Sequence, residues 1–395
     1  MITHTLRRSC LACAAVLVAA GTAYGQQTVG DVLTFLVTNR GEITTGIPQF
    51  DQAAAQATSA TISRALLASV ATLPVTSSSG AFVYRLNPEL GTVERATASF
   101  GPFFIERAST AGRGEASFAL TFQHLHFSSL DGHDLRDGTF VTLANKFKDE
   151  TTSYDENRLS MNIDASVATF YGNIGVTDYL EVGFAVPMIS LQLDGSRADV
   201  YYGRPFTQAS ASASAVGLAD MVLRTKYTVF ADHGSGVAAA VDVRLPTGKE
   251  ENLLGTGTTS VKLTGIGSME SGNAALHLNA GYTLGGLARE FSYGGAVAVA
   301  ATNHLTVSGE LLGRWIDGIG HIVPSAAPMP GLVGVETIRL LPDNSSLNIV
   351  SVIPGVKWNV SQTWILVANV GVPLTNAGLT TRFTPFVGVD YSFGR

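Results

Sequence analysis

The chain has 395 residues and a formal net charge of -6, and only 14% of its residues are charged, whereas typical soluble chains carry roughly 25%. No stretch beyond the first thirty residues holds about 20 uninterrupted apolar residues, so the sequence predicts no transmembrane helix. Its acidic balance and its lack of basic clusters exclude nucleic acid as an expected partner. Low charge without an apolar helix is typical of an outer-membrane barrel, in which only every second residue of a strand faces lipid.

The first 25 residues have the pattern of a secretory signal peptide. Arg7 and Arg8 form a positive start, an apolar run follows, and small residues three and one positions before Gln26 predict cleavage there. Both cysteines of the chain lie within this segment. We therefore expect no disulfide and no thiolate chemistry in the mature protein.

Residues 26–114 do not have the pattern of a barrel. Apolar residues at helical spacing predict a helix over Val29–Thr38, and Asp51 is a candidate N-cap for a second helix that ends near Val70. A hairpin is predicted between Phe82–Leu86 and Thr92–Arg95. We interpret the region as a plug folded into the barrel mouth or as a periplasmic cap, and a flexible leader is disfavoured by its apolar content. The candidate plug residues are Phe100, Phe103, Phe104, Glu106, Arg107 and Arg113.

From residue 115 onward, segments of alternating apolar and polar residues recur, as expected of strands that have two different faces. Most are near the roughly 9–11 residues that cross a bilayer at a tilt. The connections are alternately long and short, which is typical of outer-membrane barrels. We predict an all-β fold, an outer-membrane barrel of about twelve antiparallel strands over residues 115–395, with the N-terminal, partly helical plug or cap. The predicted strands are Glu115–Phe127, Arg158–Tyr171, Tyr179–Gln192, Leu218–Phe230, Val237–Pro246, Thr259–Ser268, Ala274–Leu284, Phe291–Ala301, His304–Trp315, Leu347–Trp358, Thr363–Leu374 and Arg382–Phe393.

The same alternation predicts which side chains face lipid and which face the lumen. In the second strand, the apolar residues from Leu159 to Val167 are predicted to face lipid, which places Asp164 in the lumen. A charge on the lipid face costs about 2–4 kcal/mol at the midplane, so we expect charged residues to point inward. Pro187 is predicted to mark a bulge in the third strand. The candidate lumen-facing residues are Asp164, Asp220, Arg224, Lys226, Asp242, Arg244, Lys262, Glu310, Arg314 and Asp390.

Two groups of residues could indicate a chemistry other than transport. One is a cluster of possible metal ligands that matches no calcium-loop spacing, and we favour a solvated rim: His124, His126, Asp131, His133, Asp134 and Asp137. His126 and Ser128 stand two apart, as a His and a Ser do in outer-membrane phospholipases, but no Asn stands at a matching spacing. We therefore predict no catalytic residue, no metal and no cofactor.

Several motifs together resemble one family of membrane proteins. They are Gly175–Gly183, Gly217–Tyr227, Arg244–Gly248, Pro354–Trp358 and Phe386–Phe393. In this order they resemble the outer-membrane transporters associated with phenol meta-cleavage pathways, which are distantly similar to long-chain fatty-acid and aromatic-hydrocarbon channels. The resemblance implies a barrel that passes small hydrophobic molecules, with the N-terminal region as its plug. It implies no catalytic or substrate-binding residues.

The leading hypothesis is passive uptake or efflux of small, apolar or aromatic compounds across the outer membrane of a Gram-negative bacterium. The expected partners are outer-membrane lipid, the solute and the barrel assembly machinery. The aromatic Phe393 resembles the terminal signal that this machinery reads, although Gly394 and Arg395 follow it. The alternatives are a surface protein that uses its long loops for adhesion or scaffolding and, less favoured, a lipid-modifying enzyme.

Overall fold

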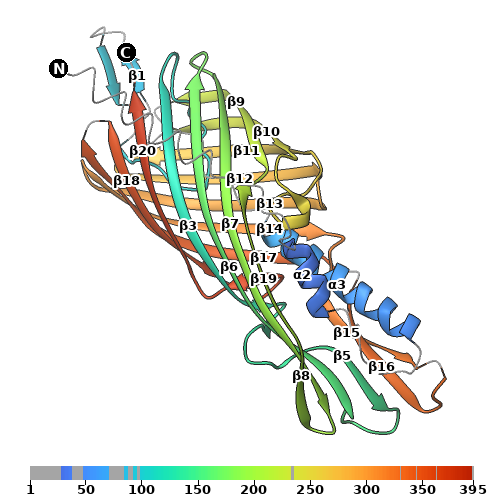
Figure 1. The fold of residues 1–395 in the computed structure, drawn as a ribbon. Coiled ribbons are helices and arrows are strands. Elements are labelled where there is room, and N and C mark those ends of the chain that lie inside the picture. The colour runs from blue at the N-terminus through green and yellow to red at the C-terminus, as the bar shows by residue number, and fades with distance from the viewer. Residues whose placement is uncertain are drawn as a thin grey trace.

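The strands form one closed antiparallel barrel with twelve strands in its wall (Figure 1). The structure is a computed structural model that describes residues 28–37, 48–70, 84–87, 92–95, 98–232, 235–329, 331–343, 345–361 and 363–393. None of the helices in these ranges is long and apolar enough to cross a membrane. The wall strands are β3 (Ala116–Leu130), β6 (Asp155–Gly175), β7 (Leu180–Tyr201), β9 (Met221–Asp232), β10 (Ser235–Leu245), β11 (Ser260–Ser271), β12 (Ala274–Gly285), β13 (Arg289–Thr302), β14 (Leu305–Asp317), β17 (Leu347–Ser361), β18 (Trp364–Pro373) and β20 (Thr384–Phe393).

Each of the twelve wall strands overlaps one predicted strand, so the predicted fold is confirmed. The prediction missed further strands within the long loops, which extend the sheet at one end of the barrel. β6 and β7 have 21 and 22 residues, about twice the length that crosses a bilayer. The additional elements are β4 (His133–Asp134), β5 (Phe140–Phe147), β8 (Arg204–Leu218), β15 (Ile322–Pro328), β16 (Val335–Pro342), β19 (Leu379–Thr381) and the 3-10 turn η1 (Glu250–Asn252).

The two ends of the barrel differ. The first residue of β3 pairs with the last residue of β20, Ala116 with Phe393, so the barrel begins and closes at one end. The short turns after β9, β11, β13 and β17 lie at this same end, shown at the top of Figure 1. In outer-membrane barrels the short turns face the periplasm and the long loops face the exterior. We accordingly name the two ends periplasmic and extracellular.

The outer surface carries an apolar belt between two rows of aromatic side chains. Near the extracellular ends of their strands, Tyr282, Phe291 and Trp315 occupy consecutive cross-strand positions. Near the periplasmic ends, the rings of Trp364 and Tyr391 lie 4.7 Å apart. Such aromatic girdles mark the two interfaces of a membrane. The barrel therefore spans the outer membrane. Exposed aliphatic residues of the belt include Leu120, Val241, Leu263, Leu278, Val297, Val307, Leu311, Leu366 and Val387.

The prediction for the faces of β6 is wrong in its extracellular half. The apolar residues from Leu159 to Val167 are buried and pack in one cluster with helices α2 (Val29–Val37) and α3 (Pro48–Val70). Asp164 and its polar neighbours occupy the opposite face, which is also the face of the exposed Phe170 and Ile174. The inversion arises because the helices fill the interior here, so the inward face must be apolar. The outward face lies beyond the membrane belt and can be polar.

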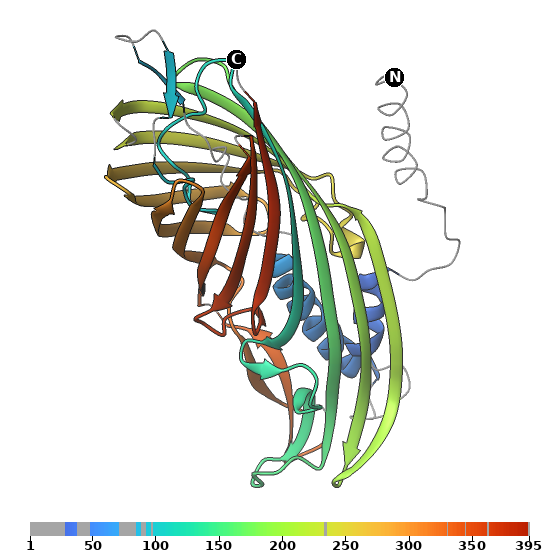
Figure 2. The same ribbon diagram turned by 90° about the vertical axis from the view of Figure 1, so that its left-hand side faces the viewer.

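Figure 2 shows the two helices on the inner side of the long strands, toward the extracellular end. The predicted helix over Val29–Thr38 is confirmed as α2, which ends at Val37. Its start is stabilised by reciprocal hydrogen bonds: the Thr28 amide donates to Asp31 Oδ2 (3.1 Å), and the Asp31 amide donates to Thr28 Oγ1 (3.0 Å). This arrangement satisfies amides that a helix leaves unpaired at its first turn.

Contacts with the wall hold α2 in place. Arg197 of β7 donates a hydrogen bond of 3.1 Å from Nη1 to the carbonyl oxygen of Leu36. Gly195 lies beside the Leu36 side chain, which occupies the space that a Cβ at residue 195 would need. The helix can therefore approach the strand closely only because residue 195 has no side chain.

Three other predictions for the chain concern local structure. α3 begins at Pro48, three residues before the predicted cap Asp51, and proline suits a first helical turn because its nitrogen needs no partner there. The predicted hairpin is confirmed as β1 (Tyr84–Asn87) paired with β2 (Thr92–Arg95). The predicted signal peptide lies outside the described residues.

The predicted bulge at Pro187 is wrong. β7 pairs with β6 without a register shift through Pro187. The strand on the other side of β7 changes at this point: β9 pairs with β7 up to Ala185, and β8 pairs with it from Met188 onward. The Ala219 amide donates to the Pro187 carbonyl oxygen at 2.9 Å. Proline cannot donate a hydrogen bond, so it suits the position where one neighbouring strand ends and another begins.

Candidate functional site

Residues 98–114, here called the strap, cross the interior of the barrel near its periplasmic end. On one side, the Phe100 amide donates to Thr306 Oγ1 (3.0 Å), and Lys357 Nζ donates to the Pro102 carbonyl oxygen (2.8 Å). On the other side, Thr228 Oγ1 donates to the Ala108 carbonyl oxygen (2.6 Å). The strap thus satisfies its backbone groups with side chains of the wall, since it has no regular secondary structure of its own.

Glu310 of β14 binds the strap at three consecutive residues. Its carboxylate accepts hydrogen bonds from three consecutive strap amides, those of Phe103 (2.5 Å), Phe104 (2.8 Å) and Ile105 (2.9 Å). The side chain is buried. Hydrogen bonds to a charged acceptor are stronger than neutral ones, so this carboxylate fixes the backbone of the strap against β14.

Charged side chains hold the middle of the strap. The carboxylate of Glu106 lies against the guanidinium of Arg224 and 3.5 Å from Lys226 Nζ. Arg224 also bonds both carboxylate oxygens of Asp242, at 2.5 and 2.7 Å. Lys226 is fully buried and lies 3.4 Å from Glu181 as well. Removal of one member of such a buried network leaves an uncompensated charge, which is strongly destabilising.

An aromatic cluster closes the opposite side of the strap. The Phe103 and Phe104 rings contact edge to face at 4.7 Å, and Phe104 lies 5.1 Å from the ring of Phe386 on β20. These rings pack with inward-facing Ile353 and Ile365 of the wall. On this side the strap is therefore held by apolar packing in addition to its bonds to Glu310 and Lys357.

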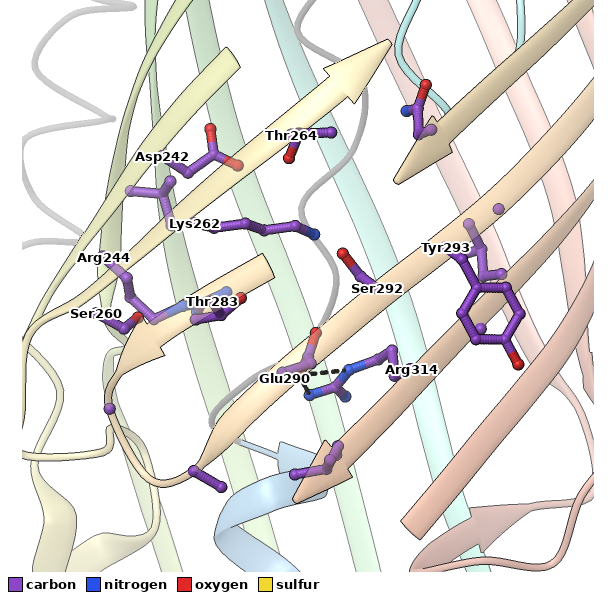
Figure 3. A pocket seen from close by; sticks show the side chains of 18 of the residues that line it. Asp242, Arg244, Ser260, Lys262, Thr264, Thr283, Glu290, Ser292, Tyr293 and Arg314 are labelled. Carbon is purple, nitrogen blue, oxygen red and sulfur yellow. Dashed lines mark hydrogen bonds and ion pairs between the residues drawn. The ribbon is translucent and has the colours of Figure 1, made fainter. Parts of the chain in front are cut away.

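A cavity of about 160 Å³ lies between the strap and α3 (Figure 3). Phe104, Ile105 and Glu106 line it from the strap, and Ala68 lines it from α3. Its apolar wall includes Leu287, Leu312, Ile316 and Ile319. A cavity of about 150 Å³ can hold a benzene molecule, so this one has the size of a single ring with a small substituent. Its polar wall comprises Arg224, Asp242, Arg244, Ser260, Lys262, Thr264, Asn279, Thr283, Glu290, Ser292 and Arg314.

The charged residues of the cavity lie mainly along one cross-strand row. Asp242 pairs with Arg224 on one neighbouring strand and with Lys262 on the other. Farther around the barrel wall, Arg314 of β14 donates to Glu290 Oε2 of β13 from both Nε (3.0 Å) and Nη2 (2.6 Å). Lys262, by contrast, makes no hydrogen bond and no ion pair within the described part of the chain. Its ammonium extends into the cavity toward Ser292 (Figure 3).

The structure brings most of the candidate lumen residues together. Arg224, Lys226 and Glu310 contact the strap, while Asp242, Arg244, Lys262 and Arg314 line the cavity. Asp390 interacts electrostatically with Lys357 and Arg107, beside the strap.

Asp220 and Asp164 lie elsewhere. Asp220 accepts hydrogen bonds from the amides of Gly248 (3.0 Å) and Thr256 (2.9 Å), so it anchors the loop between β10 and β11. Asp164 lies on the outer face of β6 against His126. Of the candidate plug residues, Phe100, Phe103, Phe104, Glu106 and Arg107 are buried and Arg113 is exposed.

Among the charged residues of the interior that sequence reasoning missed, three contact the strap or line the cavity. Lys357 shares its face of β17 with Ser351 and Asn359, so the alternation there would have identified it. Glu181 shares its face of β7 with small and apolar residues such as Ala185 and Ile189, so only its charge within a predicted strand could have marked it. Glu290 lies one residue before the predicted start of its strand, so it was assigned to a loop. All three are inward-facing partners of the strap or of the cavity.

The candidate histidines do not form a second site. His126 Nδ1 contacts Asp164, and Ser128 Oγ donates to the Thr380 carbonyl oxygen (3.3 Å), so neither residue bonds the other. Asp131 holds the loops by accepting from His321 Nδ1 (3.1 Å) and the Ile322 amide (2.8 Å). Within the residues that the structure describes, no group of three or more His, Cys, Asp or Glu side chains could hold a metal ion.

Comparison with solved structures finds similar barrels. One is an outer membrane channel from Pseudomonas putida F1, at 13% identity, covering 72% of this chain and 98% of that chain, with a TM-score of 0.45. Others are the Ralstonia pickettii toluene transporter TbuX, at 10% identity, 72% and 90% coverage and a TM-score of 0.28, and the CymD monoaromatic hydrocarbon channel, at 8% identity, 72% and 90% coverage and a TM-score of 0.28. No family model and no curated protein sequence matches the chain. The resemblance to phenol-pathway transporters therefore stays a prediction.

Proposed function

We propose that this protein is a passive outer-membrane channel for small, mainly apolar or aromatic compounds, with residues 26–114 as its plug. The observation that carries the proposal is the cavity of about 160 Å³ within the barrel, between the strap and α3. A barrel that served only as an anchor for its loops would need no chamber of this kind inside the membrane. The apolar portion of its lining suits a solute with little charge.

The position of the cavity defines a route with two barriers. On the extracellular side, α2 and α3 pack by apolar side chains against the interior of β3, β6 and β7. On the periplasmic side, the strap is bonded to the wall from β7 to β14. A solute that enters from outside must displace the helices, rest in the cavity, and leave when the strap moves. In a passive channel, the net direction of transport follows the solute gradient.

The test is to lock the strap to the wall. Ala108 of the strap and Ala238 of β10 belong to one small buried cluster, so we expect the double variant Ala108→Cys and Ala238→Cys to form a disulfide on oxidation, which is verified by thiol titration before transport is measured. We expect the oxidised variant, in proteoliposomes, to lose uptake of a labelled small solute, and reduction to restore it. The single variant Ala238→Cys, treated with the same oxidant, is the control and should transport throughout.

Each outcome decides between the alternatives. Uptake that is blocked by oxidation and restored by reduction supports a channel gated by the strap. Equal uptake by the oxidised and reduced protein would show that solute does not pass the strap. No uptake by the wild-type protein above protein-free liposomes would reject the channel and favour a surface protein that acts through its loops.

A further inference from the structure

One cation of the cavity, Lys262, forms no direct ion pair with a described residue, and the carboxylates of Glu290 and Asp242 act on it only from beyond ion-pair distance. The cavity carboxylates are engaged elsewhere: Asp242 by Arg224 through both oxygens, Glu290 by Arg314, and Glu106 by Arg224 and Lys226. Lys262 stands between Asp242 and Thr283 in the cross-strand row. Its ammonium makes no hydrogen bond or ion pair with any described residue. A partly buried cation without a partner is costly to keep, and a bound anion would compensate it.

The groups around Lys262 suit a carboxylate in particular. Thr264 and Thr283 line the same cavity and can donate hydroxyl hydrogen bonds. Ser292 also lines it, and its hydroxyl would have to turn from the Gly281 carbonyl oxygen, to which it donates a long bond of 3.4 Å. An ammonium with neighbouring hydroxyls can satisfy both oxygens of a carboxylate, and such charge-assisted bonds are the strong ones. Arg244 adds a further positive charge to the lining. Positive groups inside a low-dielectric wall attract an anion more strongly than they would in bulk water, because less water screens them.

The remainder of the cavity suits an apolar ring. Phe104 of the strap, Leu312 and Ile316 of β14 and Ala68 of α3 all line it. A site with one apolar wall and a few convergent polar groups is the usual form of a small-molecule pocket. The volume matches one six-membered ring with a small substituent.

We propose that the cavity selects small aromatic carboxylates, with the carboxylate on Lys262 and the ring against Phe104 and Leu312. This inference rests on the proposed channel function, because it names the solute that occupies the channel. It narrows that function from apolar and aromatic compounds in general to those that carry one negative charge.

The test uses three solutes of nearly the same shape and different charge: benzoate, benzamide and benzamidinium. Binding of each to the full mature chain in detergent is measured by titration calorimetry at neutral pH, where a carboxyl group is ionised. We expect benzoate to bind about tenfold more tightly than benzamide, and benzamidinium not to bind. The variant Lys262→Met should lose the preference for benzoate, whereas Lys262→Arg should keep much of it. The matched control is Lys148→Met, at an exposed turn of the extracellular loops, and it should bind as wild type does.

The outcomes separate this inference from the channel itself. Equal affinity for benzoate and benzamide, or a preference that survives Lys262→Met, would overturn the carboxylate proposal. If benzoate binds as expected but the disulfide-locked and reduced proteins transport alike, the pocket stands and the strap-gated channel fails. If the charge preference is absent but locking blocks uptake of benzamide, the channel stands and its solutes are neutral.

Discussion

The three amides bonded to Glu310 make a direct test of how the strap is held. Glu310→Gln keeps the shape of the side chain and removes its charge. The amide oxygen of glutamine can still accept from one or two of the Phe103, Phe104 and Ile105 amides, but its NH₂ group would face a backbone donor. The closed position of the strap should therefore become less stable, while the fold of the wall is retained.

The expected size follows from the bonds that are lost. A hydrogen bond to a charged group contributes about 1.5–3 kcal/mol and a neutral one about 0.5–1.5 kcal/mol. Glutamine weakens two of the bonds and loses the third. This loss is partly offset, because a neutral group is less costly to bury than a charged one. The closed position of the strap should therefore be destabilised by at least about 2 kcal/mol. Because each 1.4 kcal/mol is a factor of ten, the fraction of time that the strap is released should rise by about thirtyfold.

The assay measures that release directly. Ala108 is fully buried, and the chain has no cysteine after the predicted signal peptide, so a single Ala108→Cys reports opening by its rate of reaction with a water-soluble thiol reagent. Glu310→Gln should raise this rate about thirtyfold. The control, Glu336→Gln, removes a half-buried glutamate of an extracellular strand that pairs with Lys146 at 3.9 Å and should leave it unchanged. An unchanged rate in Glu310→Gln would refute the reasoning that this carboxylate anchors the strap.

Three further predictions concern the wall and its loops. Gly195→Val should press on Leu36 and detach α2, at a cost of about 1–3 kcal/mol for overpacking, seen as faster proteolysis within the helix. Asp220→Ala should loosen the β10–β11 loop, so that the amide of Thr256 exchanges hydrogen at least about tenfold faster, as expected for the loss of a charge-assisted bond. Leu120→Arg should cost about 2–4 kcal/mol in urea unfolding from vesicles, whereas His124→Arg, on the same outer face of β3 but beyond the belt, should cost much less.

The alternation of side chains predicted the wall strands well wherever the interior is polar. On β10, Val241 is exposed on the outside and Asp242 is buried inside. On β14, Val307 faces out while Thr306 and Glu310 face in. In these strands the lipid needs apolar atoms and the strap needs charged partners, so the two faces have the chemistry that a simple barrel predicts.

The same rule failed in β6 because it assumes one kind of interior along the whole barrel. Leu159 and Ile163 are apolar because they pack on α2 and α3, and not because they meet lipid. A sequence shows that one face of a strand is apolar, but it does not show whether lipid or a helix covers it. The length of β6 would have revealed this difference, because the strand is about eleven residues longer than a bilayer crossing needs. The predicted strand, Arg158–Tyr171, was too short to show it.

The two barriers of the interior should respond differently to strain, because their contacts differ in kind. Apart from the bond of Arg197 to its last turn, α2 is held mainly by apolar contacts, which are non-directional. The helix can therefore shift in small steps while an apolar solute replaces part of its surface. The strap is bonded by specific charged groups, Glu310, Lys357 and Arg224, and breaking one contact leaves buried charges unpaired. Amide hydrogen exchange across the strap should accordingly show one common opening for Phe103, Phe104 and Ile105, whereas the amides of α2 should exchange with graded rates. Independent exchange of the three strap amides would contradict a strap that opens as a unit.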